Sequence, residues 1–126
     1  MFYSSECIEH YKNAWDRIEK KYSDQVEKRR QNALELAAIY GRMLVEKFGA
    51  KLVKLVGSTL QPGRFNERSD IDLVVYSMPK ENFFNAVAAC MNEEFDIDVI
   101  PYEDANEFMK KAIERSGVIV YEKQFS

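Results

Sequence analysis

Hydrophobic residues recur at alternating steps of three and four through the first third of the chain, which is the spacing of helices with one apolar face. Two such stripes flank a polar stretch in which Ser23 or Asp24 can cap a new helix, and Gly49 can end that helix. The pattern therefore predicts two helices that form an N-terminal extension over residues 1–48. The stripes consist of Ile8, Tyr11, Trp15, Ile18 and Tyr22, and of Ala33, Leu36, Ala37, Tyr40, Met43 and Leu44.

After residue 50 the apolar runs become shorter and richer in β-branched residues, which indicates strands. No linker or shift in composition divides the chain, so we expect one domain over residues 1–126 with its core at 51–122. The predicted fold class is α+β, a small mixed sheet flanked by helices, with the two-helix extension packed on it. The expected elements are strands at 52–56, 71–76 and 95–100, a loop at 57–69, helices at 80–92 and 105–115, and a run at 118–120 that fits a strand or a helix.

Asp70 and Asp72 stand where the second expected strand begins. Side chains alternate across a strand, so both carboxylates point to one face. Like charges about 4 Å apart repel by roughly 4 kcal/mol at an effective dielectric of about 20, and a hard divalent cation removes that cost. Asp96 and Asp98 share a face of the next expected strand in the same way, so one of them can complete a three-carboxylate metal site. Alternation alone does not choose between them.

The loop between the first two strands has the residues of a phosphate-binding turn. Gly57 permits a backbone to approach a phosphate closely, and Ser58 offers a hydroxyl and an N–H to its oxygens. Arg64 and Arg68, in the same loop, can neutralise a triphosphate. We therefore expect a nucleotide to bind between this loop and the acidic strands.

These motifs resemble a known family. The order of a strand, Gly57-Ser58, a loop, Asp70-Ile-Asp72-Leu and a later hydrophobic-Asp-hydrophobic unit resembles the nucleotidyltransferase superfamily of DNA polymerase β. Over residues 51–122 the chain is similar to the minimal nucleotidyltransferases of prokaryotes, although its loop after Ser58 is bulkier than in many members. The resemblance implies metal-binding and catalytic roles for Asp70, Asp72 and Asp98, and phosphate-binding roles for Gly57 and Ser58.

The resemblance also implies an activity. Such an enzyme uses magnesium, with two ions expected, and moves AMP from ATP onto a hydroxyl group. Minimal nucleotidyltransferases are commonly paired with small helical HEPN proteins as toxin–antitoxin systems, so the implied acceptor is a tyrosine of a HEPN RNase toxin. The alternative is a non-catalytic antitoxin or binding module that inhibits its partner by contact.

Composition limits the other function classes. The net charge of −3 comes from 18 basic and 21 acidic residues with no basic tract, so we expect no strong nucleic-acid binding. No run approaches the roughly 18 apolar residues of a membrane span, and the N-terminus lacks a signal pattern, so a cytoplasmic location is expected. Cys7 and Cys90 lack the spacing of a zinc site or disulfide scaffold, which predicts reduced thiols in or near the core.

Two features of the extension have open interpretations. The first apolar stripe either packs wholly against the second helix or, around Trp15, binds another chain, which is a helical acceptor protein or a second copy. The basic run 28–30 is expected to be a solvated helix face.

Overall fold

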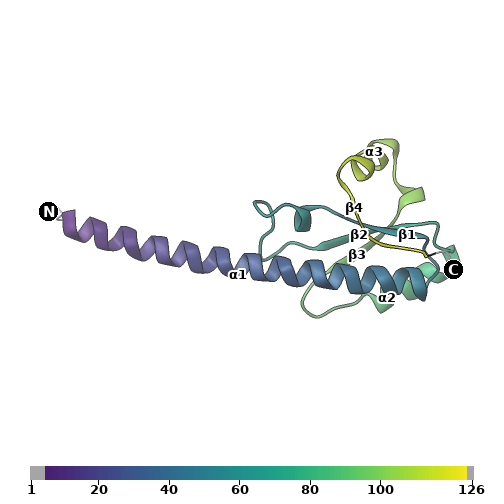
Figure 1. Ribbon diagram of the computed structural model, residues 1–126, viewed down its shortest axis with the longest axis horizontal. Coiled ribbons are helices and arrows are strands. Elements are labelled where there is room, and N and C mark those ends of the chain that lie inside the picture. Colours follow the sequence, from purple (N-terminus) through teal and green to yellow (C-terminus); the bar gives the residue numbers. More distant parts are fainter. Residues whose placement is uncertain (1–4, 125–126) are drawn as a thin grey trace.

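The computed structural model describes the backbone of residues 5–124 and the side chains of residues 8–124. It confirms an α+β fold in which a small mixed sheet is flanked by helices (Figure 1). The run after residue 117 is a strand, and the other predicted elements after residue 50 are present with ends shifted by a few residues. The elements are α1 (Ser5–Glu46), β1 (Leu52–Val56), β2 (Ile71–Tyr76), α2 (Lys80–Ala89), β3 (Ile97–Pro101), α3 (Glu107–Ser116) and β4 (Val118–Glu122), with short 3₁₀ turns at Ser58–Leu60 and Tyr102–Asp104.

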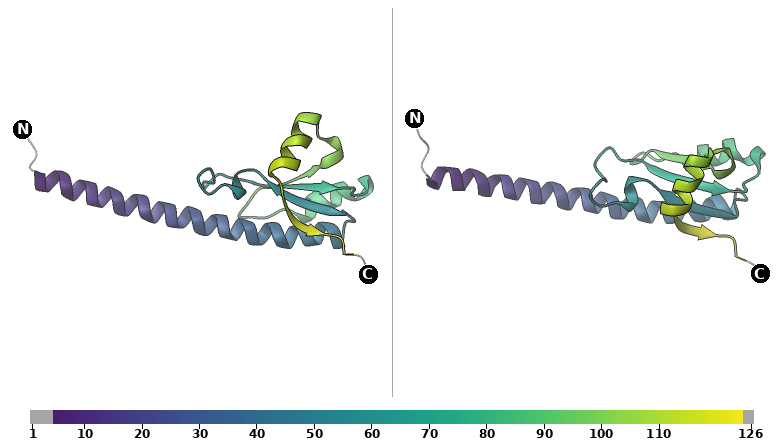
Figure 2. Two further views of the ribbon diagram at one scale, coloured as in Figure 1. Left: turned by 45° about the horizontal axis from the view of Figure 1, so that its top comes forward. Right: turned by 90° about the horizontal axis from the view of Figure 1, so that it is seen from above.

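The four strands form one sheet in the order β3-β2-β1-β4. β1 is antiparallel to β2 and β4, whereas β2 and β3 run parallel. The C-terminal half of α1 and the helix α2 cover one face of the sheet, and α3 lies on the other side (Figures 1 and 2). The parallel β2–β3 pair brings together two segments whose acidic residues lie far apart in sequence.

The core lies between α1 and the sheet. Ala33 and Ala37 have no exposed surface, so the stripe predicted for the second helix does face the core. Cys90 is a buried free thiol, as predicted, and burial raises its pKa to about 11; the side chain of Cys7 lies outside the described part. The alternate strand residues that complete this layer are Val53, Leu55, Ile71, Leu73, Val75 and Val99.

The prediction of two N-terminal helices is wrong, because α1 runs without a break from Ser5 to Glu46. Ser23 and Asp24 do not interrupt it, since each costs only a few tenths of a kcal/mol inside a helix and strong helix formers flank both. A capping residue starts a helix only where the preceding backbone has left the helical conformation. The predicted stop is correct: Gly49 has φ +83°, and the N–H of Ala50 bonds back to the carbonyl of Leu44 at 3.1 Å.

The N-terminal half of α1 extends beyond the sheet (Figures 1 and 2). The interpretation that its stripe packs on a second helix is therefore wrong, because no other helix among the described residues lies against it. α1 is also strongly charged, and no helix within residues 5–124 is long and apolar enough to cross a membrane. The apolar stripe of this half is exposed, with exposed fractions of 60% for Ile8, 63% for Tyr11, 63% for Trp15, 60% for Ile18 and 47% for Tyr22.

Deletion of residues 1–22 tests the independence of the folded part. Of the described side chains, those of residues 8–22 include none of the core, so we expect a cooperative unfolding transition to remain while the helical signal falls. Circular dichroism with chemical denaturation measures both quantities. Loss of the cooperative transition would show that this segment is needed for the core.

Candidate functional site

Two carboxylates meet where β2 and β3 run side by side. Asp72 on β2 is the direct cross-strand partner of Asp98 on β3. Asp70 lies two residues before Asp72, and Ile71 between them is fully buried on the opposite face. The sheet therefore gathers the three predicted carboxylates at one end of its α3-facing side.

The electrostatics of the site agree with the predicted repulsion. The pKa of Asp72 is raised from 3.8 to about 6, first by burial of its carboxyl group and then by the charge and hydrogen-bonding contact of Asp98, with a smaller effect of Asp70. Each cause disfavours the ionised form of Asp72. A bound cation would reverse this penalty.

The donor chemistry of the site fits magnesium. Asp72 and Asp98 offer hard oxygen ligands, and magnesium in proteins is usually held by one or two carboxylates together with substrate phosphates. Among the side chains of residues 8–124 no group of three or more histidine, cysteine or acidic residues is arranged to hold a metal ion. The assignment of all three aspartates as ligands therefore stays a prediction.

Asp96 is separated from this pair. It precedes β3, and its backbone carbonyl accepts a hydrogen bond of 2.9 Å from the N–H of Ile71. Its carboxyl group is not among the groups that raise the pKa of Asp72, whereas that of Asp98 is. The geometry thus favours Asp98, the residue that the family resemblance also selects.

Gly57 brings the backbone close to the carboxylates. β1 ends at Val56, the cross-strand partner of Asp72, and the chain then turns through Gly57 with φ +89°. A Cβ atom at Gly57 would lie 2.9 Å from Oδ2 of Asp72, so only glycine fits without displacing that carboxylate. Ser58 follows half-buried in the first 3₁₀ turn, so a group held by Asp72 would also lie near this turn.

Two arginines of α1 anchor the loop that follows. Arg30 donates from Nη1 to the carbonyl of Thr59 at 3.0 Å and is held by Glu27 at 3.0 Å. Thr59 is fully buried, and its hydroxyl donates to the carbonyl of Asp70 at 3.3 Å. Arg29 donates from Nε to the carbonyl of Glu67. These bonds connect α1 to both ends of the loop.

The expectation that residues 28–30 form a solvated face is consequently wrong for Arg29 and Arg30. The guanidinium of Arg29 stacks on the ring of Phe95 at 4.0 Å from its centroid. A signal was present in the sequence, because both arginines lie three or four residues from Val26 and Ala33, on the continuation of the apolar stripe.

Arg64 and Arg68 have exposed side chains. Their backbone N–H groups shape the loop, the first by donating to the carbonyl of Gln61 and the second by donating to Oδ1 of Asn66. Neither guanidinium forms a hydrogen bond or ion pair with another described residue. Both are free to reach a ligand, and their nucleotide-binding role stays a prediction.

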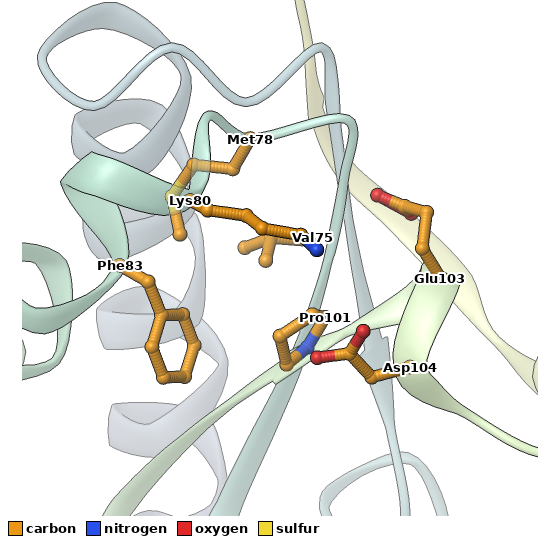
Figure 3. Close-up of a pocket in the computed structure, with 7 residues that line it drawn as sticks. All are labelled: Val75, Met78, Lys80, Phe83, Pro101, Glu103 and Asp104. Carbon is orange, nitrogen blue, oxygen red and sulfur yellow. The ribbon is translucent and has the colours of Figure 1, made fainter.

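A separate pocket of about 330 Å³ lies at the opposite end of the parallel strands (Figure 3). Val75 contributes to it from the core face, opposite to the face that carries Asp72, so the pocket does not include the carboxylates. Figure 3 shows Lys80 and Phe83 on one side of the pocket and two acidic residues on the other. Its lining residues are Val75, Met78, Lys80, Phe83, Pro101, Glu103 and Asp104.

Comparison with known proteins locates this arrangement within a family. The family model described as Polymerase beta, Nucleotidyltransferase matches residues 40–126. No curated protein gives a significant match to the sequence.

Among the solved structures that share the fold are the following two. The crystal structure of a toxin–antitoxin with AMP-PNP is 20% identical, with a TM-score of 0.52, and the match covers 69% of this chain and 74% of that one. A putative nucleotidyltransferase from Sulfolobus solfataricus is 18% identical, with a TM-score of 0.53, and the match covers 78% of this chain and 87% of that one.

Proposed function

Because the chain belongs to the polymerase β nucleotidyltransferase family, we propose that it transfers AMP from ATP onto a hydroxyl group of a partner protein. The observation that carries this proposal is the position of Asp72 beside Asp98 and against the Gly57 turn. Carboxylates that form no ion pair with a described basic side chain, next to a backbone that fits only glycine, suit a metal–triphosphate complex.

Each residue has a role in this reaction. Asp72, with Asp70 and Asp98, would hold magnesium, which when bound neutralises charge on the carboxylates and the phosphates. The Gly57 turn and Ser58 bind the triphosphate oxygens, and Arg64 and Arg68 add positive charge.

The acceptor hydroxyl requires a base. Asp98 is exposed, whereas Asp72 is only half-exposed, so Asp98 is the more accessible of the two to an acceptor. As the acceptor oxygen bonds to the α-phosphorus, its proton passes to Asp98. The bond from the α-phosphorus to the bridging oxygen breaks, and pyrophosphate leaves.

We propose a tyrosine of a HEPN-type RNase toxin as the acceptor, which makes this protein an antitoxin that acts by adenylylation. The fold shared with a toxin–antitoxin bound to AMP-PNP, an ATP analogue, supports this choice. The exposed stripe on α1 favours a second candidate, a non-catalytic antitoxin that inhibits its partner by contact.

Labelled ATP separates the two candidates. The purified protein is incubated with magnesium, ATP carrying label on the α-phosphate, and a HEPN-type partner. Covalent label on the partner, absent with γ-labelled ATP or with a chelator, supports the enzyme. Inhibition of the partner without covalent label supports the contact inhibitor and contradicts the proposed transfer.

Ser58→Ala tests the phosphate-binding turn. Loss of one hydrogen bond to a charged group costs about 1.5–3 kcal/mol, so we expect kcat/KM for ATP to fall about 10- to 100-fold. Steady-state kinetics measure the change, and Ser116→Ala, exposed at the end of α3, is the control. Unchanged kinetics in Ser58→Ala would show that other groups hold the phosphates.

A further inference from the structure

The first half of α1 carries an apolar stripe that is largely exposed to solvent. Residues 8–25 are exposed with the exception of Ala14, and burial by the domain begins at Val26. We call residues 8–25 the free half. Polar residues occupy the opposite face of this segment, so its apolar surface is confined to one side.

We propose that the free half pairs with the same segment of a second copy in an antiparallel two-helix coiled coil. The stripe residues repeat at alternating steps of three and four, which is the spacing of the a and d positions of a heptad. Ile8, Trp15 and Tyr22 take the a positions, and Tyr11 and Ile18 take the d positions.

The stripe continues the surface on which the domain is built. Beyond Tyr22 a second step of four residues reaches Val26, which packs against the core cluster, and the same side of the helix continues to the fully buried Ala33 and Ala37. The face of α1 that meets the sheet in its second half is therefore the face left bare in its first half. A second helix would extend this packing beyond the domain.

The length of the free half selects one register. If Ile18 lies opposite Trp15 of the second copy, Tyr11 lies opposite Tyr22 and Ile8 opposite Gln25. Gln25 is the last exposed residue before Val26, so this register uses the whole free half, about 27 Å at 1.5 Å per residue. It also brings the start of the second helix to the loop residue Glu67, which lines a shallow hollow together with Tyr22 and Gln25. A shift of one heptad would leave part of the stripe uncovered.

Charge favours the same register. In an antiparallel pair the e positions of the two helices lie beside each other along the seam. Lys12 and Glu19 occupy e positions, so Lys12 of each copy faces Glu19 of the other copy. Shifted by one heptad, Lys12 would face its own equivalent. In a parallel pair Glu19 would face Ala14, so the opposite charges would not meet. Complementary charge thus indicates both the orientation and the register.

The surface involved is large enough for a dimer. The three aromatic residues of the stripe are about half to two-thirds exposed, and the two isoleucines are 60% exposed. With aromatic side chains that bury about 150–250 Å² each, covering the stripe removes about 1,000 Å² in total, which is about the smallest area of a biological interface and suits a weak dimer.

The mass of the full chain in solution tests the dimer. Light scattering coupled to size exclusion at tens of micromolar should give twice the chain mass of 14.7 kDa. Ile18→Glu places a charge in the seam and should give the single-chain mass. The control Lys20→Glu, on the opposite helix face, should keep the dimer. A wild-type chain that stays monomeric, including one that associates only with a different protein, overturns the proposal.

A charge exchange tests the orientation. Lys12→Glu alone should raise the dimer dissociation constant at least tenfold, because like charges then face each other at both ends of the seam. Glu19→Lys alone should do the same, and the double variant should recover wild-type association. A dimer that neither single change weakens overturns the antiparallel register. Circular dichroism of each variant confirms that the domain stays folded, and none of these measurements depends on the proposed transferase activity.

Discussion

Replacement of Asp72 by asparagine is expected to abolish nucleotidyl transfer while making the folded protein more stable. Asp72 is the central carboxylate of the site, with Asp98 opposite it and the Gly57 backbone against it. An amide is a poorer magnesium ligand and carries no charge, so we expect kcat to fall by at least about 10²-fold. Transfer of label from ATP measures the loss.

The gain in stability follows from the raised pKa of Asp72, about 6 against 3.8. Because the folded state keeps this proton to a higher pH than the unfolded chain, ionisation of Asp72 lowers the free energy of unfolding increasingly between about pH 4 and pH 6, and the loss is constant above that range. The full shift corresponds to about 3 kcal/mol, and partial exposure of the carboxyl reduces it to about 1–2 kcal/mol.

Denaturant unfolding as a function of pH measures this effect without magnesium. Asp72→Asn should exceed the wild type in stability at pH 8, and the difference should shrink as the pH falls to 4. When magnesium is added, the free energy of unfolding should rise for the wild type and stay nearly unchanged for Asp72→Asn. The exposed Asp24→Asn on α1 provides a control in which no such change is expected. An active Asp72→Asn, or one less stable than the wild type at pH 8, would contradict this account.

Asp98→Asn is expected to reduce transfer far more than Asp96→Asn. Both replacements are isosteric, and both residues are exposed at neighbouring positions, so each serves as a control for the other. Only Asp98 pairs with Asp72 across the parallel strands. Loss of a positioned base contributes about 10²- to 10⁴-fold, which sets the expected fall in kcat.

Single-turnover kinetics with saturating ATP give the comparison. Asp96→Asn should remain within about threefold of the wild type, the scale of a surface change below about 0.5 kcal/mol. A larger loss for Asp96→Asn would assign the third carboxylate to the start of β3 instead. Equal losses would show that the two positions act together.

Strand alternation gave most of what the sequence could reveal about the site. The period of two in 71–76 is a local property, so it places Asp70 and Asp72 on one face before any tertiary contact is known. The pairing of Asp72 with Asp98 is not local. It depends on β2 and β3 running parallel, which alternation does not predict; the resemblance implied a role for Asp98 but gave no strand direction.

Tertiary packing explains what the sequence pattern missed. Two adjacent arginines in a charged run predict a solvated surface. The loop after β1 packs against α1, and its backbone carbonyls accept hydrogen bonds from Arg29 and Arg30. The Ser23–Asp24 stretch was ambiguous for a related reason. Cap residues favour the start of a helix only where the chain turns. Helix-forming residues lie on both sides of this stretch, so α1 continues through it as one helix.

The two glycines of the loop after β1 impose opposite limits on sequence variation. At Gly57 any added carbon displaces a carboxylate oxygen, and φ is +89°, so drift at this position alters the site itself. At Gly63 an added Cβ has no neighbour within 4 Å among the described residues. Related chains can therefore differ in size and charge at the tip of this loop, while its first residue stays glycine. The loop can change what it contacts without displacing the carboxylates of the site.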